Sequence, residues 1–169
     1  MEAKNLLPGE VNMKSGIARL SLVAMSSILL VTIGSAAQKG SNWDATDDAQ
    51  TAVGSIRSIN TAEIYYAKEY KTGWSPTLTA LGVPPTGEKP SAAAAGFLDK
   101  SLTSGKKSNY VFTYKAGKPD GSGKIDSYTL SVRPVKWHAG LWNFFDDDSG
   151  KIRGTRENRA STVNDPPLE

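Results

Sequence analysis

The chain has 169 residues, which is enough for one domain once an N-terminal segment is set aside. It has no cysteine, which excludes disulfides, zinc–thiolate sites and cysteine nucleophiles, and its single histidine, His138, excludes a metal site built from several histidines. The 20 basic and 17 acidic residues leave a formal charge of only +3, and no dense basic run or nucleic-acid-binding signature is present. We therefore expect no nucleic-acid partner.

Residues 1–37 have the pattern of a targeting or anchoring segment. Leu20–Ala37 carries no charge over 18 residues and follows the basic residues Lys14 and Arg19. One interpretation is a secretory signal peptide that is cut after Ala37. The other is a retained membrane helix, which would hold the protein in the membrane through residues 17–37, since a span needs about 17–25 residues. In both cases residues 38–169 are exported to the cell envelope or beyond it, because the basic residues stay on the cytoplasmic side.

A long amphipathic helix is predicted over residues 44–70. Three acidic residues stand at its start, where negative charge favours the helix dipole. Gly73 and Pro76 follow its end and stop it. Its apolar residues recur every three to four positions and would face a core. This stripe is formed by Ala49, Ala52, Val53, Ile56, Ile59, Ala67 and Tyr70.

Two polar residues, Asn60 and Glu63, fall within or beside this apolar stripe. A buried carboxylate is costly unless its oxygens accept hydrogen bonds. We therefore predict a structural role, in which Asn60 and Glu63 bind backbone N–H groups of a covering loop. The alternative, a general base at Glu63, has no partner histidine or metal cluster in the sequence to support it.

The second half of the chain predicts a loop, a sheet and a tail. Residues 71–107 are rich in Gly, Pro and Ser and read as a loop. The sheet is expected over 108–153, with strands at 109–115, 125–133, 141–145 and 151–153, the first two of which form an antiparallel hairpin. A polar tail, 154–169, follows. The predicted fold is α+β, with one long N-terminal helix packed on a small antiparallel sheet of three to four strands.

Asp146, Asp147 and Asp148 stand just before Gly150, between the last two predicted strands. The simpler interpretation is an acidic β-turn on the surface. The alternative is a weak calcium site, because carboxylate oxygens are the ligands that hard cations require. The spacing is not that of an EF-hand, and we expect no other cofactor.

His138 lies in a predicted loop together with two tryptophans, Trp137 and Trp142. A catalytic histidine needs a nucleophile on one side and an orienting carboxylate on the other, and no such motif is present. We therefore expect a surface histidine, no catalytic residue and no enzymatic activity. The two tryptophans would either form an exposed patch for a partner or a glycan, or cover the end of the sheet.

Several segments of the chain resemble the type IV pilins and the pseudopilins of type II secretion. The match is carried by AVGSIRSINTAEIYYAKEY at Ala52–Tyr70 and by GWSPTLTALG at Gly73–Gly82. The strand-like segments YVFTY at 110–114 and SYTLSVRP at 127–134 agree with it, as does FFDDDSGKIR at 144–153. The resemblance implies a pilin-like fold and a structural role beside like subunits or other pilus or secretion components. It also implies possible calcium at the acidic turn, because major pseudopilins hold calcium near their C-terminal loop.

The N-terminus departs from the pattern of that family. Pilins carry a Gly followed five residues later by a Glu, whereas Gly16 here is followed by Ile17-Ala18-Arg19-Leu20-Ser21. A second functional hypothesis is therefore kept. In it the chain is a secreted pilin-like binding module that does not polymerise and contacts its partner through Trp137 and Trp142.

Overall fold

The computed structural model describes residues 46–168, and its longest element is the helix α1 (Asp47–Tyr70). Thr46 caps the helix, since its side chain accepts a hydrogen bond from the Ala49 N–H at 3.3 Å. The helix ends at Tyr70, and the C-cap residue Lys71 adopts a left-handed conformation with φ 60°. The predicted C-terminal end at residue 70 is confirmed. The predicted start at Asp44 and the whole of the targeting segment lie outside the described residues.

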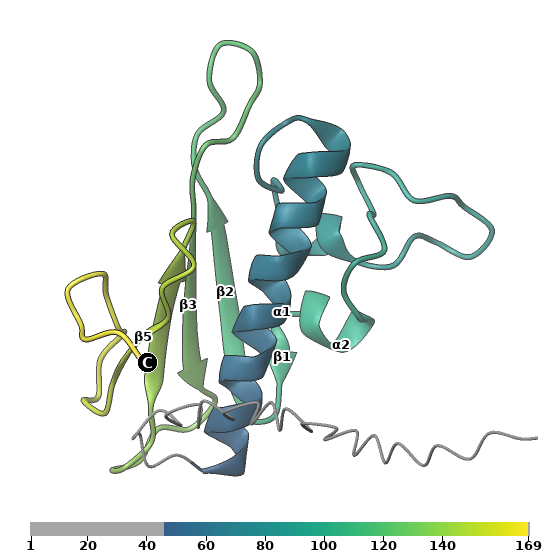
Figure 1. Cartoon of the computed structure of the whole chain (residues 1–169). Helices are drawn as coiled ribbons and strands as arrows, with labels where there is room; N and C mark the ends of the chain where they lie inside the picture. The colour runs from purple at the N-terminus through teal and green to yellow at the C-terminus, as the bar shows by residue number, and fades with distance from the viewer. Residues whose placement is uncertain (1–45, 169) are drawn as a thin grey trace, which may run out of the picture. The chain divides into compact units, whose positions relative to one another are not determined.

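Five antiparallel strands form one sheet in the order β1-β2-β3-β4-β5 (Figure 1). The α+β class is confirmed, but the expected count of three to four strands is wrong. Each strand pairs with the next along the chain, so the sheet is a meander. The strands are β1 (Lys106–Lys107), β2 (Tyr110–Ala116), β3 (Tyr128–Pro134), β4 (Asn143–Asp147) and β5 (Arg153–Thr155).

The strand that the sequence missed is β1, which falls in the predicted loop 71–107. It pairs with β2 through a two-residue turn, Ser108–Asn109, because Lys107 lies opposite Tyr110. Both turn residues have positive φ, 46° and 60°, as the tightest hairpin turns require. A strand of two lysines shows no alternation of apolar and polar residues, so no strand could be predicted there from the sequence pattern.

The last two strands begin two residues later than predicted, at Asn143 and Arg153. This shift changes the environment of the three aspartates. Asp146 and Asp147 lie within β4, opposite Leu130 and Thr129 of β3, and only Asp148 lies in the connecting turn. The prediction that all three form a surface turn is therefore wrong.

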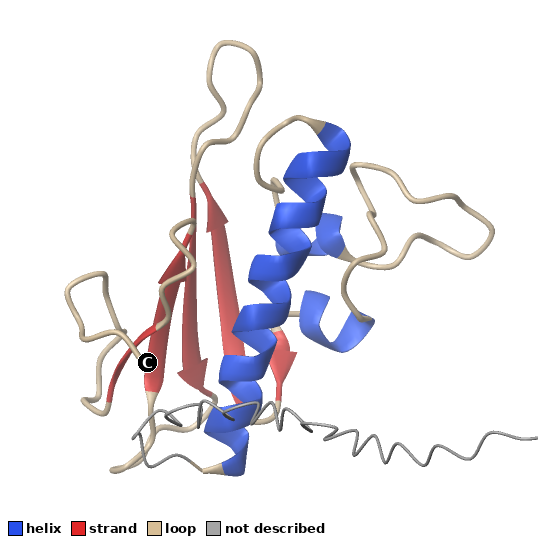
Figure 2. Ribbon diagram, viewed as in Figure 1, coloured by secondary structure: helices blue, strands red, loops and turns tan. Residues whose placement is uncertain are grey.

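Helix α1 packs along one face of the sheet, and the core lies between them (Figures 1 and 2). The apolar stripe of the helix is buried as predicted from Ala49 to Ile59, and Tyr66 extends it, whereas Ala67 and Tyr70 are only partly covered. Alternate residues of the strands complete the core, as expected for a sheet with one covered face. They are Tyr110, Phe112, Leu130, Val132 and Phe144.

The segment between α1 and β1 covers one side of the helix–sheet pair. It contains the 3₁₀ helix η1 (Leu78–Leu81) and the short helix α2 (Lys100–Thr103). Its backbone folds back on itself, since the Leu98 N–H donates to the Leu81 carbonyl at 2.9 Å. Within residues 46–168 no helix has both the length and the hydropathy of a membrane span.

Candidate functional site

Glu63 is fully buried between α1 and the covering segment. Its carboxylate accepts two hydrogen bonds from Ser75, one from the backbone N–H at 2.8 Å and one from the hydroxyl at 2.5 Å. Tyr114 of β2 completes the cluster, because its hydroxyl donates to the Ser75 carbonyl at 2.9 Å. Glu63 thus fixes the first residues after α1 to both the helix and the sheet.

Burial raises the pKa of Glu63, and the hydrogen bonds from Ser75 and Tyr114 offset only part of this effect. The groups that the carboxylate contacts are hydroxyls and a backbone N–H, with no cation among them. A general base needs access to a substrate proton, and Glu63 lines none of the three grooves described below. Its geometry is that of a structural anchor.

Asn60, one turn before Glu63, contacts the strands and not the covering loop that the sequence predicted for it. Its amide nitrogen donates to Asp146 Oδ1 at 3.3 Å, and its amide oxygen accepts from the Tyr128 hydroxyl at 3.0 Å. The Tyr128 ring stacks on Tyr114 with centroids 5.4 Å apart. The two polar residues of the helix therefore belong to one chain of contacts that crosses the helix–sheet interface.

Asp146 is the second fully buried carboxyl. Its Oδ1 accepts from Asn60, whereas its Oδ2 is buried without a hydrogen-bond partner among the described residues. Loss of water raises the pKa of Asp146 to about 7, and the charges of Asp147 and Asp148 add to the shift. A proton on this carboxyl is the least costly way to keep it in an apolar site.

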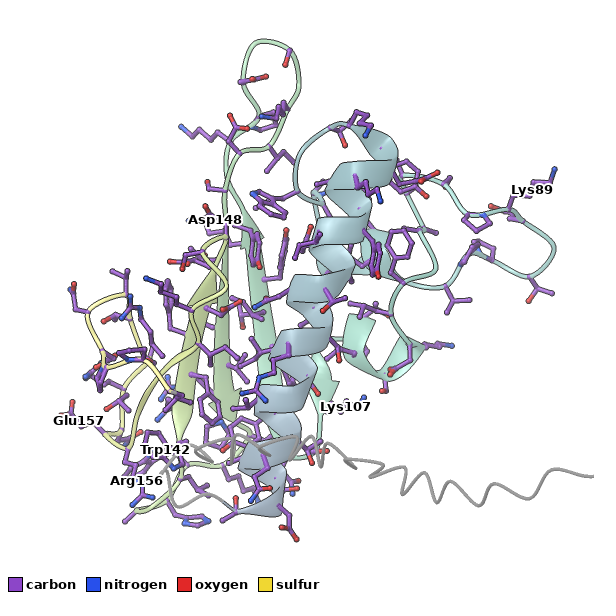
Figure 3. The ribbon with its side chains drawn as sticks, viewed as in Figure 1. Lys89, Lys107, Trp142, Asp148, Arg156 and Glu157 are labelled. Atoms are coloured by element: carbon purple, nitrogen blue, oxygen red, sulfur yellow. The ribbon has the colours of Figure 1, made fainter. Side chains whose placement is uncertain are left out.

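The three aspartates do not converge on one point. Successive residues of a strand point to opposite faces, so Asp146 turns into the core while Asp147 binds the Ser149 N–H through Oδ1 at 3.0 Å. Asp148 is exposed (Figure 3). The part of the chain that the structure describes contains no cluster of three or more acidic, histidine or cysteine side chains placed to hold a metal ion. Calcium binding stays an untested alternative.

Trp142 covers the lower end of the sheet in Figure 3, with Arg156 beside it. Its ring stacks on Phe144 with centroids 6.3 Å apart, and the Arg156 guanidinium lies 4.8 Å from its centroid. Trp137 is half-buried, and its Nε1 is enclosed without a partner among the described residues. His138 is exposed and lines a groove of about 400 Å³ together with Asp48 and Tyr110.

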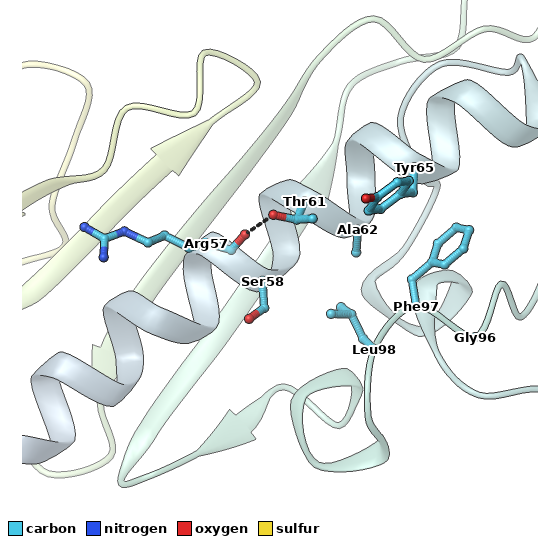
Figure 4. Close-up of a pocket in the computed structure, with 8 residues that line it drawn as sticks. All are labelled: Arg57, Ser58, Thr61, Ala62, Tyr65, Gly96, Phe97 and Leu98. Atoms are coloured by element: carbon cyan, nitrogen blue, oxygen red, sulfur yellow. Dashed lines mark hydrogen bonds between the residues drawn. The ribbon is translucent and has the colours of Figure 1, made fainter. Parts of the chain in front are cut away.

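The structure also has two grooves beside α1 that the sequence did not predict. The first, here the outer groove, has a volume of about 540 Å³ and lies between α1 and residues 96–98 (Figure 4). Tyr65 and Phe97 flank it with ring centroids 6.1 Å apart, and both rings are exposed. Tyr65 lies off the apolar stripe of the helix, and this position was a sequence signal for the outer groove.

The second, here the basic groove, has a volume of about 420 Å³ and shares Arg57 with the outer groove. It is lined by Arg57, Gly150, Lys151, Ile152, Arg153, Pro167 and Leu168.

Comparisons of the chain with protein-family models, with curated proteins and with solved structures find no match.

Proposed function

We propose that this chain is a structural, pilin-like or pseudopilin-like subunit of the cell envelope, which packs beside like subunits in a type IV pilus or a type II secretion-type assembly. The observation that carries the proposal is the outer face of α1. The sheet covers one side of the helix, while the other side exposes Ile64 at 60% and Tyr65 at 56% of their surfaces. Phe97 extends the same apolar surface.

An exposed apolar surface of this kind favours a contact with another protein. Full burial of an aliphatic or aromatic side chain contributes about 1.5–3 kcal/mol. The exposed parts of Ile64, Tyr65 and Phe97 would each add a fraction of this to a subunit interface. The uncharged segment Leu20–Ala37 precedes α1 in the sequence. A retained segment would bring neighbouring copies together in the membrane plane, where a weak contact is enough.

The proposal is tested by the assembly state of the full chain in envelope fractions. We expect the Ile64→Asp/Tyr65→Asp variant to sediment as a smaller species than the wild type. The matched control is Val135→Asp, because Val135 is also exposed, at 56%, but lies beyond the end of β3. Equal sedimentation of all three proteins, or equal loss in both variants, would contradict the proposed interface.

The secreted binding module is the second candidate, and the small residues Ser35-Ala36-Ala37 favour it because they suit a signal-peptide cleavage site. Mass spectrometry of the mature N-terminus separates the two functions. An N-terminus at Gln38 in the culture fluid would support the secreted module and contradict the anchored subunit. A terminus at Ile17, or an intact Leu20–Ala37 in membranes, would support the subunit.

A further inference from the structure

The basic groove combines three cations with a small apolar floor. Arg57 comes from the middle of α1, while Lys151 and Arg153 come from the segment that enters β5. The floor is formed where the tail runs beside that segment, since the Leu168 N–H donates to the Ile152 carbonyl at 2.8 Å. No acidic residue is among the described residues that line it.

Two of these cations are available for a ligand. Arg57 and Lys151 are exposed, and neither forms an ion pair within residues 46–168. Figure 4 shows the Arg57 side chain, which lines one end of the outer groove, extending away from Tyr65 and Phe97. Arg153 is held in place by a hydrogen bond from its Nη1 to the Asp165 carbonyl at 3.0 Å. A fixed guanidinium presents paired donors that match a carboxylate.

The densest acidic segment outside β4 and its turn is the start of α1. Asp47 and Asp48 occupy its first turn, and Asp47 is exposed. Asp48 accepts a hydrogen bond from the Asn109 amide at 2.8 Å, which holds its carboxylate beside the helix end. Arg57 follows Asp47 by ten residues, which is about 15 Å along the helix axis.

We propose that the basic groove of one copy binds the acidic first turn of α1, Asp47 and Asp48, of a second copy. This inference rests on the proposed function, since it needs copies that lie side by side. Within one copy the acidic turn and Arg57 are about 15 Å apart on the same helix, so they reach each other only between copies. A neighbour displaced by about that distance along the axis would bring opposite charges together.

Between copies that lie parallel, the contact joins two different surfaces and is heterologous, so it does not close into a symmetric dimer. Each copy keeps one free groove and one free acidic turn, and addition of further copies can continue. The exposed charges steer the encounter and set the offset between copies.

The test uses engineered cysteines in the full chain, which has none of its own. We expect Asp47→Cys/Lys151→Cys to give a ladder of disulfide-linked oligomers when envelope fractions are oxidised. Asp47→Cys/Lys115→Cys is the control, because Lys115 is also exposed but lies on β2 and does not line the basic groove. The control should give no ladder.

Exchange of the two opposite charges is the second part of the test. We expect Arg57→Asp to lower the assembled fraction in sedimentation by about fivefold, the upper range for one exposed ion pair, and Asp47→Arg/Arg57→Asp to restore it. This inference would be overturned if the chain assembles but Asp47→Cys/Lys151→Cys gives no ladder and the charge variants leave the assembled fraction unchanged. The proposed function would still stand in that case. A wild-type chain that never sediments as an oligomer would overturn both.

Discussion

Replacement of the buried carboxyl of Asp146 should change how the stability of the protein depends on pH. The group has an ordinary pKa of 3.8, which the folded state raises to about 7. Between these values the unfolded chain has released the proton and the folded chain still holds it. The contribution of Asp146 to folding stability is therefore fully present below about pH 4 and is lost as the pH rises through 7.

The size of this effect follows from the shift. A difference of about three pKa units corresponds to about 4 kcal/mol between pH 4 and pH 8, at 1.36 kcal/mol per unit. Asp146→Asn keeps the shape of the side chain and its acceptor for Asn60 but cannot ionise. We expect the wild type to lose about 4 kcal/mol more than this variant over that range, as an upper figure.

Urea unfolding at a series of pH values, followed by tryptophan fluorescence with a chelator present, measures the difference. The difference in pH dependence between the wild type and Asp146→Asn does not contain the pH-independent effect of the amide on stability. It also does not contain the contribution of Glu63, whose pKa is raised as well and which is present in both proteins. Asp126→Asn is the matched control, because Asp126 is an exposed carboxylate beside Lys124. Parallel curves for the wild type and Asp146→Asn would refute the reasoning, since they would mean that Asp146 ionises in the folded state at no cost.

Three further outcomes are expected. Glu63→Ala should lower the free energy of unfolding by about 3 kcal/mol, because it leaves the buried N–H of Ser75 without its acceptor and opens a cavity, and Glu63→Gln should recover most of this loss in urea titrations. Gly73→Ala should cost about 2 kcal/mol or more, because Gly73 has φ 77° and its added Cβ would overlap the Ile125 carbonyl, whereas Gly121→Ala, with open space around it, should change the Tm little. Calcium chloride at pH 8 should leave the Tm unchanged, and a rise that is absent from Asp146→Asn would instead establish a metal site.

The parts of the fold that the sequence predicted are those with a local repeat. The 3.6-residue period predicted α1 and its end at residue 70. The alternation of apolar and polar residues predicted most of β2 and β3, and the short turn between them predicted their pairing as a hairpin. The β1 strand was missed because its pairing depends on the backbone of Ser108 and Asn109, both at positive φ. That conformation is set by the neighbouring strand and leaves no periodic trace in the sequence.

The candidate site was predicted only in part, for a similar reason. The position of Glu63 in an apolar stripe implied a buried carboxylate with donors around it, and Ser75 is such a donor. Asp146 was read as a turn residue because three adjacent aspartates are typical of exposed turns. Its burial follows from the register of β4 against β3, which places it opposite Leu130, and register is a tertiary property.

The buried polar residues between α1 and the sheet also determine the position of the grooves on the outer surface. Apolar packing alone tolerates a helix that slides along a sheet, because hydrophobic contacts are not directional. Asn60 and Glu63, which lie one turn apart, bind partners on β3, β4 and the segment after α1, and a shift of one turn would leave buried carboxyls without their donors. The register of α1 on the sheet is thereby fixed. Arg57 and Tyr65 belong to the same helix, so the buried contacts also determine where the basic groove and the outer groove stand on the surface.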